Sequence, residues 1–212
     1  MEDLKDLQEL LTKFGAVKKE SLQNECTKIA ESLFCNYCIN CNGTEYYFAE
    51  IEFYYWQKNV WDEKWNRVTY PRNCNAGDLF YHLSGIDICF HSSYEEAKFG
   101  GILIRAIMDE NNIVTAGPLT CKDLLLNTCQ GQKMPIFKKA NKPREWTPQV
   151  SPTKRLLGKT DMKNKIDKDL ELCFYDSNIT SEEWNPMRKW YDKRKGSEKE
   201  KKGTYRTDRF NK

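Results

Sequence analysis

The sequence predicts an α+β fold: a single domain with a curved, mostly antiparallel β-sheet, packed helices and a basic C-terminal tail. The length of 212 residues suits one hydrophobic core with short additions. Apolar residues recur at helical spacing near the N-terminus, whereas aromatic and β-branched residues gather in short runs after residue 45. A helix pair followed by hairpins, with no internal repeat that we can find, leads to this fold class.

Three helices are expected. Leucines recur at helical spacing over 4–14, where Gly15 is placed to end the helix. An apolar stripe predicts a second helix over 21–34. A third begins at Gly117-Pro118, because proline costs no hydrogen bond in the first turn, and runs through Leu126.

The strands are expected to follow the first two helices. The segment YYFAEIEFYYW at 46–56 is rich in residues that suit a pleated surface. Further strands are predicted at 78–83, 86–90, 101–108 and 170–175, the first two of these joined as a hairpin by a turn at Ser84-Gly85. The stretch 57–76 has no clear period and is expected to be a long loop.

Charge divides the chain into two parts. Residues 188–212 hold eleven Lys and Arg against four acidic residues, a net charge of +7, which leaves −4 for the other 187 residues because the whole chain carries +3. We therefore expect a folded domain over 1–187 and a flexible tail over 188–212 that either binds phosphates or serves as a solvated terminus.

Composition points away from membranes and export. No apolar run approaches the roughly 20 residues of a membrane-spanning helix, and the N-terminus opens with acids where a signal peptide would carry Lys or Arg. The nine cysteines are then expected to be reduced thiols in a cytoplasmic protein. We expect no membrane partner and a monomer.

Two carboxylates are the first candidates for chemistry. On alternating strand faces, Glu50 and Glu52 would share a face with Tyr46, Phe48, Tyr54 and Trp56. A carboxylate among aromatic walls loses hydration and can exchange a proton near neutral pH, although a strand edge with both Glu in water explains the same pattern.

Arg105 and His82 are the next candidates. Arg105 interrupts an apolar strand, so it either faces solvent or pairs with a carboxylate such as Glu50 or Glu52. His82 shares its strand face with Phe80 and could stack on a flat ligand, or be a partly buried polar residue.

The cysteines Cys26, Cys35, Cys38 and Cys41 suggest a metal site. Four thiolates suit zinc or an iron–sulfur cluster. However, the last three enter a strand whose alternation sends them to opposite faces. We therefore expect no shared metal and no cofactor.

In order along the chain, these segments resemble the alkyladenine (3-methyladenine) DNA glycosylase family. Glu50-Ile51-Glu52-Phe53-Tyr54 is similar to the family's E-T-E-A-Y segment. Four further segments resemble its R-x-T-P-R-N, G-x-L-Y-V-Y, L-L-R-A and G-P motifs, namely 67–73, 77–82, 103–106 and 117–118. The resemblance covers about residues 26–127 and, more weakly, extends to 175.

The resemblance implies a hydrolase for DNA repair by base excision. Glu52 would activate water for attack on the N-glycosidic bond of a damaged purine, and Arg105 would hold Glu52 or the water. An extruded purine would lie between Tyr54, His82 and, as a further contact, Trp56. His82 replaces a stacking aromatic of the family, and Leu83 or Ser84 stands where the family carries a wedge tyrosine.

DNA is the partner that the resemblance implies. Arg67, Arg72 and the basic tail would contact the nucleic-acid backbone. Two other functions remain open: a non-catalytic nucleotide or nucleic-acid binding module with the same aromatic pocket, and a thiolate-metal protein in which the sheet is only a scaffold.

Overall fold

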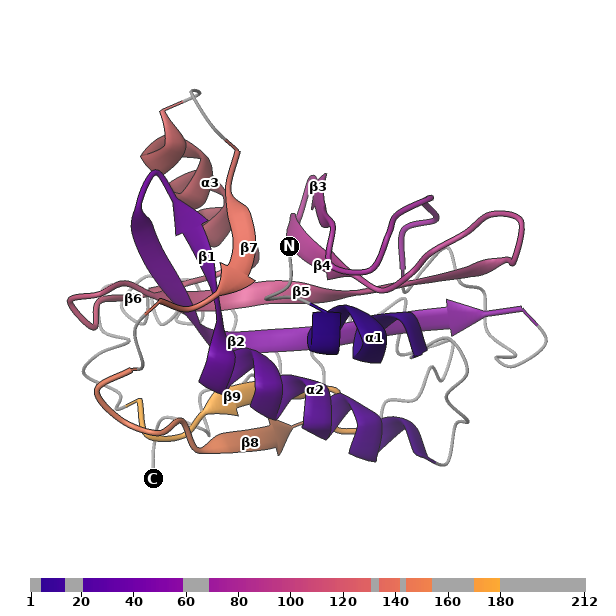
Figure 1. Cartoon of the computed structure of the whole chain (residues 1–212), viewed down its shortest axis with the longest axis horizontal. Coiled ribbons are helices and arrows are strands. Elements are labelled where there is room, and N and C mark those ends of the chain that lie inside the picture. The colour runs from indigo at the N-terminus through magenta and orange to yellow at the C-terminus, as the bar shows by residue number, and fades with distance from the viewer. Residues whose placement is uncertain are drawn as a thin grey trace, which may run out of the picture.

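The computed structural model describes residues 5–13, 21–58, 69–130, 134–141, 144–153 and 170–179 (Figure 1). Within them the chain forms an α+β domain with a curled antiparallel sheet, as the sequence predicts. The boundary expected at residue 188 and the basic tail lie outside the described residues. No helix of the described part is long and apolar enough to cross a membrane.

The helices lie close to their predicted positions, and the sheet has more strands than predicted. The three helices are α1 (Lys5–Lys13), α2 (Leu22–Asn36) and α3 (Pro118–Cys129). The strands are β1 (Tyr37–Cys41), β2 (Thr44–Gln57), β3 (Leu79–His82), β4 (Gly85–Cys89), β5 (Lys98–Met108), β6 (Val114–Ala116), β7 (Ile136–Lys139), β8 (Val150–Thr153) and β9 (Cys173–Asp176). The short strands β6, β7 and β8 have too few residues to show a period in the sequence.

The long strands β2 and β5 are the axis of the sheet. The main strand order is β3-β4-β5-β2-β1-β7, with β6 paired to β5 and the β8–β9 pair added to β2. Asn42 and Gly43 both have positive φ and make the tight turn between β1 and β2, as a two-residue hairpin of this twist requires. The strand β2 therefore has β5 along one edge and β1 and β9 along the other.

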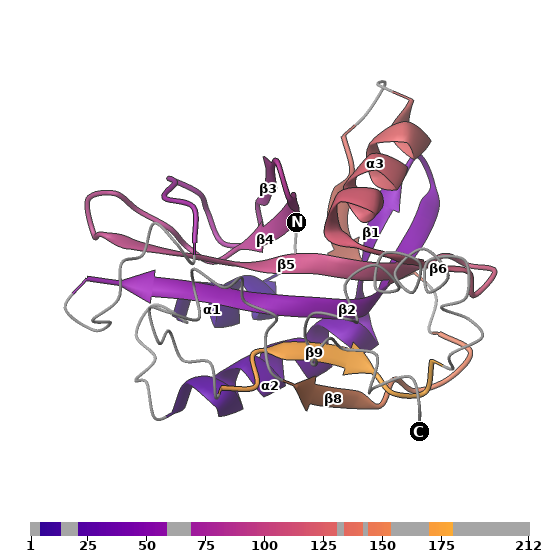
Figure 2. The same ribbon diagram turned by 180° about the vertical axis from the view of Figure 1, so that it is seen from behind.

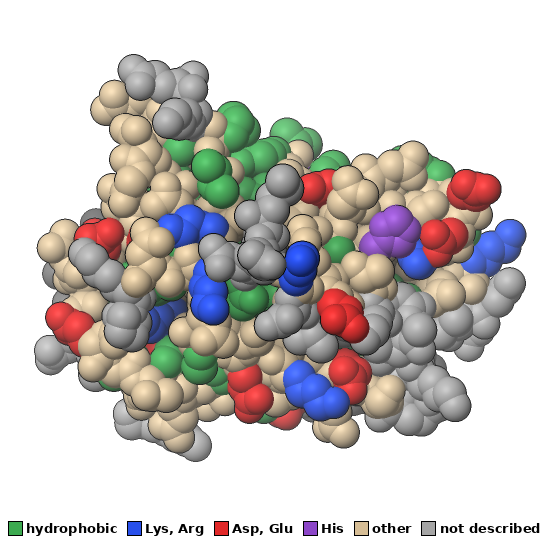
Figure 3. Space-filling view, viewed as in Figure 1, with side chains coloured by type: hydrophobic (Ala, Val, Ile, Leu, Met, Phe, Trp, Pro, Cys, Tyr) green, Lys and Arg blue, Asp and Glu red, His purple; other side chains and the backbone are tan. Residues whose placement is uncertain are grey.

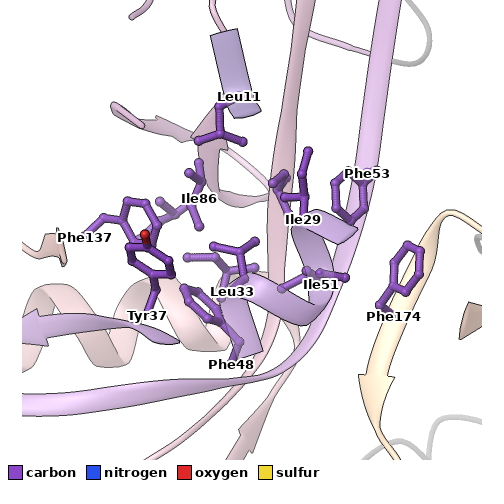
Figure 4. Close-up of a cluster of buried hydrophobic side chains, with 14 of the residues drawn as sticks. Leu11, Ile29, Leu33, Tyr37, Phe48, Ile51, Phe53, Ile86, Phe137 and Phe174 are labelled. Carbon is purple, nitrogen blue, oxygen red and sulfur yellow. The ribbon is translucent and has the colours of Figure 1, made fainter. Parts of the chain in front are cut away.

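The main hydrophobic core lies between the sheet and the helices α1 and α2, which cover one face of it (Figures 1 and 2). Leu33 of α2 and Leu11 of α1 are fully buried. Figure 4 shows Leu33 beside Phe48 of β2, and the same cluster includes Phe53 of β2 and Phe174 of β9. Burial of this apolar surface is the main favourable term in the stability of the domain.

An irregularity in β2 corrects the predicted faces of this strand. The β2–β5 ladder shifts between Phe48 and Ile51, where Glu50 lies opposite Ala106. Such a shift reverses the alternation of side chains. Tyr46 and Phe48, predicted on the carboxylate face, therefore join the same core as Ile51.

We predict that Leu33→Ala lowers the free energy of unfolding by about 2–5 kcal/mol, because it leaves a cavity against the sheet. Urea denaturation followed by circular dichroism measures the loss. Asn24→Ala, at an exposed position of the same helix, should change the stability by less than about 0.5 kcal/mol. Equal effects of the two substitutions would contradict this position of the core.

Candidate active site

Glu52 lies on the central strand of the sheet and has strands on both sides. It pairs with Leu103 of β5 on one side and with Cys173 of β9 on the other. Its side chain has no exposed surface, and that of Glu50 is also buried. The alternative in which both carboxylates lie in water is therefore wrong.

Arg105 bridges the two carboxylates, so of the two alternatives for this residue the paired one is found. Its Nε donates to Glu50 Oε1 at 3.2 Å, and its Nη1 donates to Glu52 Oε2 at 2.6 Å. Burial acts to lower the pKa of Arg105, but the charges of Glu52 and Glu50 outweigh this effect and raise that pKa well above its ordinary value. Arg105 is therefore a permanent cation between two acids.

Tyr54 and Cys173 complete the cluster around the carboxylates. The Tyr54 hydroxyl donates to Glu52 Oε1 at 2.8 Å, so each oxygen of Glu52 accepts from a different side chain. The Cys173 thiol donates to Glu50 Oε1 at 3.2 Å. These contacts fix the orientation of the Glu52 carboxylate, which a general base requires.

A second ion cluster on the same face was missed by the sequence analysis. Asp87 of β4 accepts from Arg72 Nη1 at 2.7 Å and lies 3.1 Å from His82 Nε2. His82 Nδ1 accepts from the Ser84 backbone N–H, so Nε2 carries the proton and donates to Asp87. The signal was present, because Asp87 interrupts the apolar run IDICF as Arg105 interrupts GILIRAIM.

The two clusters lie in one row across the sheet. The register places Phe80, Asp87, Leu103 and Glu52 opposite one another on β3, β4, β5 and β2. Asp87 and Glu52 are two strands apart, which is about 10 Å between backbones. The side chain between them is that of Leu103.

His82 has aromatic neighbours of its own. Its ring lies 4.8 Å from that of Tyr70 and 5.9 Å from that of Phe80, on which it is stacked. Its side chain is 7% exposed, whereas Tyr70 is 46% exposed. Of these two rings, that of Tyr70 is the one that solvent or a ligand can reach. The sequence analysis did not single out Tyr70 as a base-binding residue.

The remaining predicted base and backbone contacts have other positions. Trp56 is 7% exposed and stacks on Phe99 at 5.9 Å, two residues beyond Tyr54. Arg72, predicted to contact phosphate, is buried beside Asp87 and lies over the ring of Phe80. Arg67 lies outside the described residues.

The molecular surface on the side of α1 and α2 carries charged side chains of both signs. In Figure 3 the basic and acidic side chains of this face are interspersed. The described residues seen in that view therefore make no continuous basic track of the kind that follows a phosphate backbone.

The cysteines that were considered as a metal site have different neighbours in the structure. Cys35 is exposed at the end of α2. Cys38 lies beside Glu45, and burial, with a smaller effect of this carboxylate, raises the pKa of its thiol to about 12. Cys41 lies beside Cys129 instead. In the described part of the chain, no group of three or more His, Cys, Asp or Glu side chains is arranged to hold a metal ion.

Comparison with known proteins leaves the site to be judged on its own geometry. No family model, no curated protein and no solved structure matches the chain.

We predict that Arg105→Met lowers the free energy of unfolding by about 3–5 kcal/mol, because it leaves two buried carboxylates without their cation. Chemical denaturation at neutral pH measures the effect. The triple variant Glu50→Gln, Glu52→Gln, Arg105→Met should lose less than Arg105→Met alone, since no buried charge is left in this cluster. If Arg105→Met is as stable as the wild type, the bridge does not hold the site together.

Proposed function

We propose that this protein is a DNA glycosylase-like hydrolase that excises a purine by water attack on the N-glycosidic bond. Glu52 is the general base, and Arg105 holds it in place. The observation that carries the proposal is the fully buried carboxylate of Glu52, fixed at both oxygens by Arg105 and Tyr54.

The charge of the cluster supports this chemistry. Two carboxylates share one guanidinium, so this buried site holds one more acidic than basic side chain. A fixed negative charge stabilises the positive charge that develops on the sugar as the base departs. Inside the protein this stabilisation is larger than it would be in water.

The reaction balances with water as the only co-reactant. The water oxygen bonds to C1′ as the bond from C1′ to the base nitrogen breaks, and the departing purine keeps that electron pair. Glu52 accepts the proton that the attacking water loses. The purine takes a proton from solvent, and Glu52 later returns to solvent the proton that it accepted. Tyr54 is half-buried beside Glu52, which supports its assignment as the contact with the base.

Access to Glu52 requires a change at Tyr54. The carboxylate has no exposed surface, and the Tyr54 hydroxyl occupies one side of Oε1. Water and substrate therefore reach this oxygen when the hydroxyl moves away. The same enclosure favours the second candidate, a non-catalytic nucleic-acid or nucleotide binding module in which the cluster only supports the sheet.

The turn between β3 and β4 supports a nucleic-acid substrate. Leu83 is 89% exposed at this turn, and the Lys122 ammonium of α3 donates to the carbonyl of His82 at 2.8 Å. An exposed apolar side chain on a fixed turn suits insertion between bases, as a wedge in the place of an extruded nucleotide. We propose DNA as the partner and base-excision repair in the cytoplasm as the setting, with the basic tail as a backbone contact.

Glu52→Gln tests the catalytic role. The amide keeps the size of the side chain and still accepts from Arg105, but it takes no proton from water, so base release should fall by roughly 10²- to 10⁴-fold while binding persists. Single-turnover assays with alkylated or deaminated DNA, together with a binding titration, separate the two effects.

Glu50→Gln is the matched control for this variant and should reduce base release less. If Glu52→Gln releases purine at the wild-type rate, Glu52 is not the base. If the wild type itself releases none while Tyr54→Ala abolishes binding, the binding module is the better description.

Leu83→Ala tests the wedge. Because the side chain is exposed, the free energy of unfolding should change by less than about 0.5 kcal/mol. Base release from duplex DNA should fall, whereas release from single strands should change little, since no partner base has to be replaced there. Ile113→Ala, another exposed apolar side chain, is the control, and an equal loss in this variant would argue against a special role of Leu83.

A further inference from the structure

One edge of the Arg72 guanidinium, formed by Nε and Nη2, is buried and has no hydrogen-bond partner among the described residues. The residue is 3% exposed. In this part of the chain, the third nitrogen, Nη1, donates a hydrogen bond to Asp87. A buried donor without a partner destabilises a protein by about 1–3 kcal/mol, which makes this edge a candidate binding element.

Three residues determine the position of this edge. Asp87 binds Nη1 at 2.7 Å, and the ring of Phe80 lies 4.4 Å from the guanidinium carbon. Gly101 gives the guanidinium its room, because a Cβ at this position would overlap Nη2 and lie 3.1 Å from Asp87 Cβ. The position of the edge is thus built into the sheet.

One nitrogen of the edge lies over β5, the strand next to β2. Asp87 is on β4, Nη2 lies over Gly101 on β5, and Gly101 pairs with Tyr54 on β2. Nη2 is therefore about one strand spacing from Tyr54. A ligand held by this edge would lie near Tyr54 and Glu52.

The two nitrogens form a planar pair of donors. Such an edge of arginine matches two adjacent acceptors in one plane, as on a carboxylate, a phosphate or the O6 and N7 atoms of guanine. Adenine presents N7 beside a donor amino group and does not match. A planar base also suits a place beside Tyr54.

We infer that Arg72 is a specificity-determining residue that binds the O6–N7 edge of a guanine-type purine. The inference rests on the proposed function in taking the ligand to be a purine. It goes beyond that function in naming the edge that is recognised and the residue that recognises it.

The test is a binding titration of the full chain with guanosine, inosine, adenosine and 7-deazaguanosine. Guanosine and inosine carry both acceptors, adenosine has a donor at position 6, and 7-deazaguanosine lacks N7. The first two should bind more tightly than the last two by roughly 5- to 150-fold. Because no bond is broken, an absence of base release would leave this result unaffected.

Arg72→Lys should reduce the preference to about twofold or less, because lysine keeps a charge beside Asp87 but has no planar pair of donors. Gly101→Ala is the second variant, in which the guanidinium is displaced without loss of Arg72, and it should have the same effect. Arg144→Lys changes another buried arginine, which pairs with Asp176, and should keep the preference.

Four results would overturn the inference. One is equal affinity of wild-type protein for guanosine and adenosine, and a second is no saturable binding of any of the four nucleosides. Another is a guanosine preference that both Arg72→Lys and Gly101→Ala retain. The last is saturable binding of inorganic phosphate that Arg72→Lys abolishes, together with no preference among the nucleosides. This result would show that the edge binds an anion.

Discussion

The pairing of Arg105 with two buried carboxylates is the constraint on which the centre of this protein depends. Glu50 and Glu52 come from β2, and Arg105 comes from β5, so the bridge joins the two longest strands of the sheet at the place where their ladder is irregular. Buried charges are tolerated only where they are paired and hydrogen-bonded. Tyr54 and Cys173 supply further hydrogen bonds to the carboxylates.

The irregularity and the ion cluster depend on each other. On a regular strand, Tyr46 and Phe48 would share a face with Glu52, and large aromatic side chains would compete with the acids for that face. The shift sends them into the core with α2, and the other face carries the acids beside a small apolar cluster that includes Ala106, the residue opposite Glu50. Asp87 lies on this face too, in the row of Glu52, and the Arg72 guanidinium lies next to that row.

The sequence predicts the parts of this arrangement that follow from periodicity. The α+β class, the helices, the β3–β4 hairpin and the contact of Arg105 with the carboxylates agree with the structure. The faces of β2 were predicted wrongly at its first half, because a one-residue shift in a ladder has no signature in the composition of a strand. The role of Asp87 could have been predicted by the same rule that singled out Arg105, namely that a charge within an apolar strand needs a partner.

The positions of Arg72 and Tyr70 could not be predicted in this way. Both lie in a segment without a period, and their positions depend on long-range contacts with Phe80, His82 and Asp87. Loop residues are positioned by the scaffold that they pack on, so their surroundings follow from the tertiary structure.

The proposed function requires Glu52 to act in a hydrolytic site. The most direct measurement is mass-spectrometric detection of free purine after incubation of the wild-type protein with alkylated, deaminated and undamaged DNA, both duplex and single-stranded. The proposed role of Glu52 requires that at least one of these substrates yields a free purine and an abasic sugar in equal amounts, at a rate proportional to the protein concentration. The absence of any released base from all of them, with nucleic acid still bound by the protein, would contradict it.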